Sequence, residues 1–185
     1  MNLKCESSMM DRILKKRYKK TIKYLGRQLV IPPALDIGSH NDFGITLSLR
    51  YGFKYYHTAG DLNYFWTAIE KNYDTVFCFE VIEHLINPGS FLVNLKRYIH
   101  KDTHVIISIP RHFFKRFWGK AHFHEMDEMR FRELVKDSGY KIIDRSMDWN
   151  FAGVTGIRPL IRFMLGYSLI TACRRYYYTL TLEGK

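Results

Sequence analysis

The feature that most constrains the fold is a short apolar run followed at once by three titratable side chains. The run Val76 to Phe79 is typical of a strand buried on both faces of a sheet. Glu80, Glu83 and His84 come directly after it. In open parallel sheets, ligands bind beyond the carboxyl ends of the strands. The sequence therefore predicts a parallel sheet with a chemically active cluster at the tip of this strand.

Strand and helix patterns alternate along the rest of the chain. Strands are predicted at Leu35–Ile37, Phe53–His57, His104–Pro110, Tyr140–Met147 and Tyr176–Leu182. Helices are predicted at 45–51, after the capping pair Asn87-Pro88, and at 127–138. This alternation indicates an α/β fold, with a Rossmann-like, mostly parallel sheet and flanking helices.

The positive charge is concentrated at the two ends of the chain. The net charge is +11, of which residues 1–30 contribute +7 through nine Lys or Arg and two acids. Apolar residues recur there at helical spacing over 9–29, which predicts a basic amphipathic helix. We therefore divide the chain into a basic N-terminal helix, residues 1–30, and one domain, residues 31–185. The helix makes nucleic acid or a membrane surface a candidate partner.

The chain shows no segment typical of export or membrane crossing. An apolar h-region is absent from its first ten residues, and no 18-residue apolar span occurs. The longest apolar stretch, Leu160–Cys173, contains Arg162, so it suits a core helix or a membrane surface. The three cysteines show no metal-type spacing. A reducing, cytoplasmic location is expected.

Several of these segments together resemble a known enzyme family. Leu-Asp-Ile-Gly at 35–38, Phe79–Leu85 and Val105–Pro110 are similar to motifs of class I S-adenosylmethionine-dependent methyltransferases. The similarity extends over about residues 34–148, and the branch it resembles contains the ubiquinone-biosynthesis O-methyltransferases.

The resemblance implies roles for five residues in binding S-adenosylmethionine. Asp36 and Gly38 would lie beside its methionine part. Asp61 would accept a hydrogen bond from the ribose or the adenine amine, and Leu62 and Phe79 would flank the adenine.

The chain departs from the family pattern in two places. His40 and Asp42 stand where the family has its second and third loop glycines. The segment from Gly38 to Asp74 is also short, which leaves room for the loss of one strand–helix pair.

The cluster of Glu80, Glu83 and His84 has three interpretations. It could be purely structural, or His84 with Glu80 could supply a general base for a hydroxyl acceptor. Alternatively, both carboxylates and His84 could hold Mg²⁺ or Mn²⁺. Methyltransferases that act on the 3′-terminal ribose of small RNAs use a similar Glu-x-x-Glu-His element with a later His. Here that later residue would be His122, with His124 as its neighbour.

The expected function is S-adenosylmethionine-dependent methylation, on the oxygen of a small-molecule or lipid-like acceptor. Two alternatives remain open at the level of sequence. One is a ribose 2′-O-methyltransferase acting on RNA through the metal site. The other is a methyltransferase-like binding module without turnover, since the glycine loop is degenerate.

Overall fold

The structure is a computed structural model that describes residues 15–69, 72–112, 121–124, 126–151 and 172–184. Its centre is a six-stranded sheet in the order β2-β1-β5-β6-β8-β7. The strands are β1 (Ala34–Asp36), β2 (Tyr56–His57), β5 (Tyr73–Phe79), β6 (Ile99–His112), β7 (Tyr140–Phe151) and β8 (Ala172–Leu182). Strands β2, β1, β5 and β6 are parallel, whereas β8 is antiparallel to both β6 and β7. The predicted fold class, a mostly parallel sheet with flanking helices, is confirmed.

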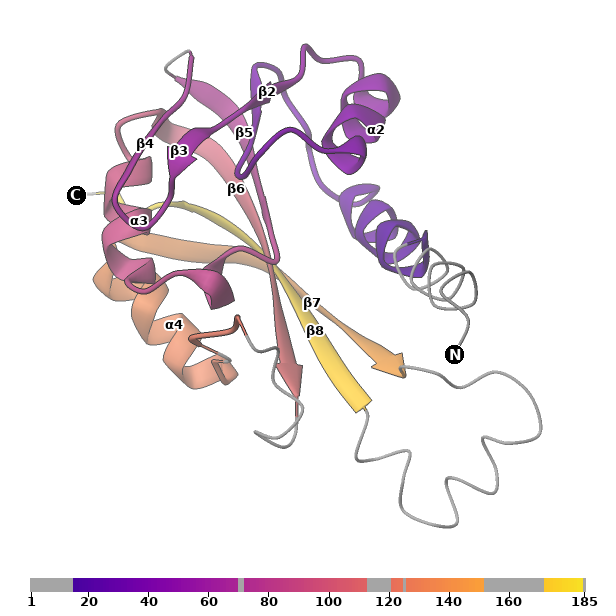
Figure 1. The fold of residues 1–185 in the computed structure, drawn as a ribbon, viewed down its shortest axis with the longest axis vertical. Coiled ribbons are helices and arrows are strands. Elements are labelled where there is room, and N and C mark those ends of the chain that lie inside the picture. Colours follow the sequence, from indigo (N-terminus) through magenta and orange to yellow (C-terminus); the bar gives the residue numbers. More distant parts are fainter. Residues whose placement is uncertain (1–14, 70–71, 113–120, 125, 152–171, 185) are drawn as a thin grey trace.

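Helices cover both faces of the sheet (Figure 1). The N-terminal helix, described over 15–25, and α2 (Asp42–Tyr51) lie on one face. Helices α3 (Pro88–Leu95) and α4 (Glu128–Asp137) lie on the other. The predicted cap at Asn87 is confirmed, because its side chain caps α3. The side chain of Asp127 caps α4 in the same way.

The two faces form two separate apolar cores because side chains alternate along each strand. On β5, Val76 and Cys78 point into the core beneath α3 and α4, while Phe77 points into the core beneath α2 and the N-terminal helix. On β8, Tyr178 points into the first of these cores and Tyr177 into the second. All five side chains are fully buried, which explains why these strands read as continuous apolar runs.

A hairpin occupies the place where a strand–helix pair would be expected. Strands β3 (Ala59–Asp61) and β4 (Phe65–Thr67) pair with each other antiparallel and form a sheet of their own. In the described chain, β2 is therefore the edge strand of the main sheet. The short segment from Gly38 to Asp74 had indicated that one strand–helix pair could be missing, and the structure has the hairpin in its place.

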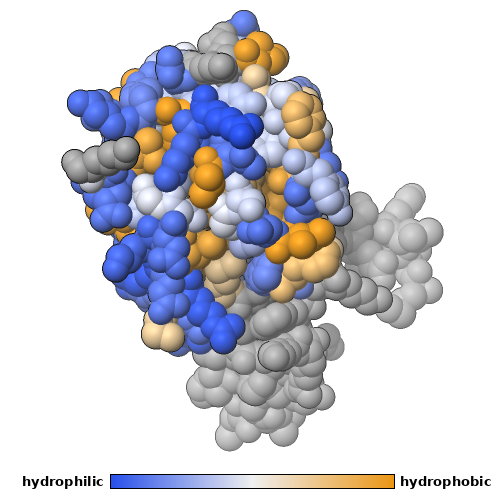
Figure 2. Space-filling view, turned by 90° about the vertical axis from the view of Figure 1, so that its left-hand side faces the viewer, coloured by the Kyte–Doolittle hydropathy of each residue, from blue (hydrophilic) through white to orange (hydrophobic). Residues whose placement is uncertain are grey.

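The surface over α3, α4 and the hairpin is mixed in character. Figure 2 shows hydrophobic side chains there in separate patches with hydrophilic ones between them. In the part of the chain that the structure describes, no helix is long and apolar enough to cross a membrane. The aromatic loop at 113–120 and most of the apolar stretch Leu160–Cys173 lie outside the described residues.

Gly44 allows α2 to approach the tip of β1. A Cβ atom at this position would lie 2.6 Å from Asp36 Oδ2 and even closer to the ring of Tyr55. We predict that Gly44→Ala lowers the free energy of unfolding by about 1–3 kcal/mol, because overpacking outweighs the gain in helix propensity. Denaturant unfolding measures the change.

Gly89→Ala is the matched control, since a Cβ in the first turn of α3 would meet its neighbours at an ordinary 3.5 Å. This variant should be neutral or more stable by up to about 1 kcal/mol. Equal stability of the two variants would contradict the packing argument.

Candidate active site

A sizeable cavity opens beyond the carboxyl ends of β1, β2 and β5. We call it the main cavity; its volume is about 580 Å³, which is within the range of small-molecule sites. It is lined by Gly38, Ser39, His40, His57, Thr58, Ala59, Gly60, Asp61, Leu62, Asn63, Glu80, Val81, His84 and Leu85. Three of the five residues predicted to bind the cofactor, Gly38, Asp61 and Leu62, are among them.

The loop after β1 keeps glycine at the position where the backbone requires it. Gly38 has a φ of +129°, and a Cβ there would meet nothing within 4 Å. Thr58 holds this turn, since its hydroxyl accepts from the Gly38 amide at 2.9 Å and lies 3.2 Å from the Gly38 carbonyl. His40, at the family's second glycine position, packs edge-on against the rings of Tyr55 and His57. The loop is therefore degenerate in sequence but still leaves open space beside Gly38.

Asp36 and Phe79, the other two residues predicted to bind the cofactor, do not line the main cavity. Both line a second space of about 220 Å³, which we call the inner cavity, under the N-terminal helix. Phe79 packs its ring against Phe43 and Phe77. From the tip of β5 it is Val81, rather than Phe79, that reaches the main cavity.

The Asp36 carboxylate is buried and only partly satisfied. Its Oδ2 accepts from Asn41 Nδ2 at 2.8 Å and from the Tyr55 hydroxyl at 3.1 Å. Its Oδ1 accepts none of the hydrogen bonds within the described chain. Burial raises the pKa of Asp36 to about 6, although both hydrogen bonds act to lower it.

Glu80 is held by two arginines from distant parts of the chain. Its Oε1 accepts from Arg175 Nε at 2.8 Å and from the Ser108 hydroxyl at 3.1 Å, and its Oε2 accepts from Arg17 at 2.9 Å. Burial alone would raise the pKa of Glu80, but the charges of Arg175 and Arg17 outweigh it and hold this pKa below its usual value. Glu80 is thus an ionised anchor that lines both cavities.

The predicted convergence of Glu80 with Glu83 is wrong. The spacing suggested one helical face, but Glu80 adopts a left-handed φ of 57°. The chain then enters the 3₁₀ helix η1 (Ile82–His84). The left-handed residue breaks the helical relation, so the Glu80 side chain turns toward β6 and β8 and is not a member of the candidate metal group.

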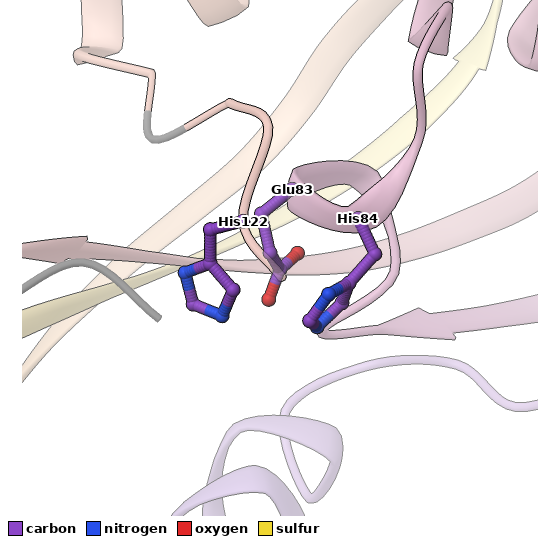
Figure 3. A group of neighbouring side chains, drawn as sticks. All are labelled: Glu83, His84 and His122. Atoms are coloured by element: carbon purple, nitrogen blue, oxygen red, sulfur yellow. The ribbon is translucent and has the colours of Figure 1, made fainter. Parts of the chain in front are cut away.

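Glu83, His84 and His122 do converge, as predicted. One ligand atom from each lies within 4.8 Å of the others. Figure 3 shows the Glu83 carboxylate beside the two imidazole rings, which are in edge contact with centroids 4.7 Å apart. His84 also lines the main cavity, which connects this group to the site.

The backbone fixes this arrangement. The Phe123 and His124 amides both donate to the Glu83 carbonyl, at 2.8 and 3.1 Å. His84 Nδ1 lies 3.0 Å from the Ala121 carbonyl; since a carbonyl only accepts, Nδ1 carries a proton, and Nε2 is the nitrogen that holds the lone pair in the neutral ring. His124, the second candidate for the later histidine, contacts the Ile86 carbonyl instead.

The Glu83 carboxylate lacks any hydrogen-bond partner in the described chain. Glu83 is 1% exposed, and neither of its oxygens forms such a bond. Burial first, and then the charge of Glu80, raise the pKa of Glu83 to about 8. An unpaired buried carboxylate is unfavourable, and a bound cation would remove that penalty. One oxygen donor and two imidazole nitrogens are a reasonable ligand set for a divalent ion.

Sequence reasoning missed the residues that hold the site from a distance. Arg17, Ser108 and Arg175 contact Glu80, and Thr58 clamps Gly38. Arg175 directly precedes a predicted strand and Arg17 lies within the predicted basic helix. The sequence therefore showed two positive charges but not that both contact Glu80. Their common partner depends on the order of β8 and β6 in the sheet, which no local pattern shows.

The raised pKa of Asp36 generates a stability prediction. The folded state favours its protonated form, so this stabilisation is complete below about pH 3.8 and is lost as the pH rises to about 6. Asp36→Asn does not ionise, so its stability relative to the native chain should increase by about 2–3 kcal/mol over this interval. Urea unfolding of both chains from pH 4 to 7 measures it. A pH-independent difference would contradict the prediction.

The comparisons with known proteins agree with this geometry. A family model described as a methyltransferase domain matches residues 11–145, and no curated protein matches the chain. A putative methyltransferase from Bacillus halodurans has a TM-score of 0.57 at 12% identity, covering 82% of this chain and 92% of its own. A SAM-dependent methyltransferase from Archaeoglobus fulgidus has a TM-score of 0.55 at 14% identity, covering 91% of this chain and 93% of its own.

A third similar structure contains ligands. It is a Haemonchus contortus phosphoethanolamine N-methyltransferase in complex with phosphomonomethylethanolamine and S-adenosylhomocysteine. Its TM-score is 0.60 at 11% identity, over 91% of this chain and 53% of that one. The family model covers well over half of the sequence, and the strand-tip cavity lies where this fold binds ligands. The chain therefore belongs to the methyltransferase domain family and is a SAM-dependent methyltransferase.

Proposed function

We propose that this enzyme transfers a methyl group to a hydroxyl oxygen of a small-molecule or lipid-like acceptor. The observation that carries the proposal is the buried, unpaired Glu83 carboxylate, which is grouped with two imidazoles beside the main cavity. A neutral amine is already nucleophilic, whereas a hydroxyl must lose a proton during the transfer. Groups arranged to remove that proton favour oxygen as the acceptor atom.

The cofactor would span the two cavities, with its adenosine in the main cavity and its methionine end in the inner one. The methionine end carries an ammonium and a carboxylate, so it needs one negatively charged and one positively charged side chain as partners. The inner cavity offers Asp36, with Oδ1 facing no donor of the described chain, and Arg17, of which only one nitrogen contacts Glu80. Gly38 leaves the space between strand tip and ligand open. When bound, S-adenosylmethionine supplies an electrophilic methyl group.

The residues of the cluster would then prepare the acceptor. His84 Nε2 would be the ligand atom because Nδ1 is bound to the Ala121 carbonyl, the arrangement found in most metal-ligating histidines. Glu83, His84 and His122 would together hold Mg²⁺ or Mn²⁺. Such an ion lowers the pKa of a nearby hydroxyl toward neutrality. Glu80 would not ligate it but would keep the strand tip in place.

The first test concerns the cofactor. Gly38→Val should abolish binding of S-adenosylhomocysteine in calorimetry, because the side chain fills the ligand's space and strains a positive φ. Gly52→Val is the matched control: Gly52 also has a positive φ (+68°) and open surroundings, but it caps α2 away from both cavities. If the two variants bind equally well, the assignment of the main cavity is wrong.

The second test concerns the metal, with Mn²⁺ alone as the probe. The native chain should bind Mn²⁺ and gain thermal stability, since a ligand of the folded state stabilises it. Glu83→Gln and His122→Ala should each weaken binding by about tenfold or more, because each loses one ligand. His104→Ala is the control, since His104 contacts the Leu29 carbonyl outside the group.

Equal Mn²⁺ binding by all four proteins, or none by the native chain, would exclude the metal site. His84 acting as a simple general base would then be the better explanation. O-methylation is tested separately with acceptor panels: transfer to amines alone would contradict it.

A further inference from the structure

The outer face of the N-terminal helix is a continuous basic surface. Residues 15–28 include no acid. At about 100° per residue, six cations fall within an arc of roughly 140°: Lys15, Lys16, Lys19, Lys20, Lys23 and Arg27. The opposite face is buried, with Tyr24 and Leu25 4% and 0% exposed. The helix therefore presents only its charged side to solvent.

The flank of this helix forms a polar cleft with the edge strand β7. Lys20, Lys23 and Arg27 line it together with Ser146 and Asp148, around a volume of about 210 Å³. Asp144, the other nearby acid, is hydrogen-bonded to Gln28 and does not line the cleft. Among the described residues that line the cleft, three are cations and one is a carboxylate, and Asp144 adds a second negative charge nearby, so the positive charges remain in excess.

We propose that this face and cleft bind the phosphodiester backbone of a nucleic acid. The cations run from Lys15 to Arg27, about 18 Å at the helical rise, with Arg27 in the turn directly after the helix. That length matches about five phosphates at 3.4 Å of axis per nucleotide of one strand. The Ser146 hydroxyl adds a donor of the kind that contacts phosphate oxygens.

A membrane surface fits the same charges less well. Helices that lie on membranes insert an exposed apolar face beside their basic one. Here the apolar face is occupied by the sheet and α2, where Leu25 packs with Phe43 and Leu47. Among the described residues just after the helix, Leu29 is the most exposed apolar one, at 61%. One such side chain is a weak anchor.

The binding surface is separate from the proposed cofactor and metal residues, so the two proposals can fail independently. The test is fluorescence anisotropy with labelled single-stranded RNA and DNA of the same sequence, on the full chain. With about five phosphate contacts, affinity should fall roughly 100-fold between about 50 and 200 mM salt. Lys19→Glu/Lys23→Glu should weaken binding at least about tenfold and reduce the salt slope by about 1.4, since two contacts are lost.

The control variant Lys54→Glu/Lys136→Glu carries the same charge change at two exposed lysines, one before β2 and one in α4. It should bind like the native chain, and both variants should retain S-adenosylhomocysteine binding. The proposal is overturned if the helix variant binds as the native chain does, or if the control loses as much. Binding to phosphatidylserine vesicles without binding to RNA or DNA would overturn it too.

Discussion

The clamp on the Glu80 carboxylate is the interaction on which the rest of the site depends. It joins the tip of β5 to β6 through Ser108, to β8 through Arg175 and to the N-terminal helix through Arg17. Arg175 is 5% exposed and the Glu80 side chain 18%, so this pair is largely buried. Removing one partner of such a pair typically costs about 3–5 kcal/mol, because it leaves the other charge unpaired. The left-handed backbone of Glu80 persists because these contacts hold it.

The clamp also divides two neighbouring acids into different roles. Glu80 contacts two cations, so it stays charged. Glu83 contacts neither, and burial together with the Glu80 charge outweighs the weaker attraction of the two arginines and raises its pKa. Two carboxylates only three residues apart therefore differ in protonation. Glu80 is a structural anchor, whereas Glu83 can bind a proton or a cation. The contrast arises from their surroundings alone.

Sequence patterns predicted the elements well and the site in part. Apolar runs identified β5 and β6, and Asn87 and Asp127 predicted the starts of α3 and α4, because burial and capping are local properties. Gly38, Asp61 and Leu62, which were predicted to bind the cofactor, line the main cavity.

The failures have a common cause. Helical periodicity was extended through Glu80, where one positive φ ends it, and Phe79 was assigned to a pocket that Val81 enters. A single backbone dihedral redirects every side chain after it, and a sequence gives little sign of such a residue when it is not glycine. The partners of Glu80 depend on strand order, which is equally invisible locally.

The backbone bonds around η1 have a consequence for how this protein can change over evolution. The position of His122 follows from two main-chain amides, those of Phe123 and His124, donating to one main-chain carbonyl. Main-chain groups are common to all residues except proline at the amide. The side chain of Phe123, which is 60% exposed, is therefore free to drift to other types without moving the imidazole beside it. Proline at 123 or 124 is the substitution that selection should exclude.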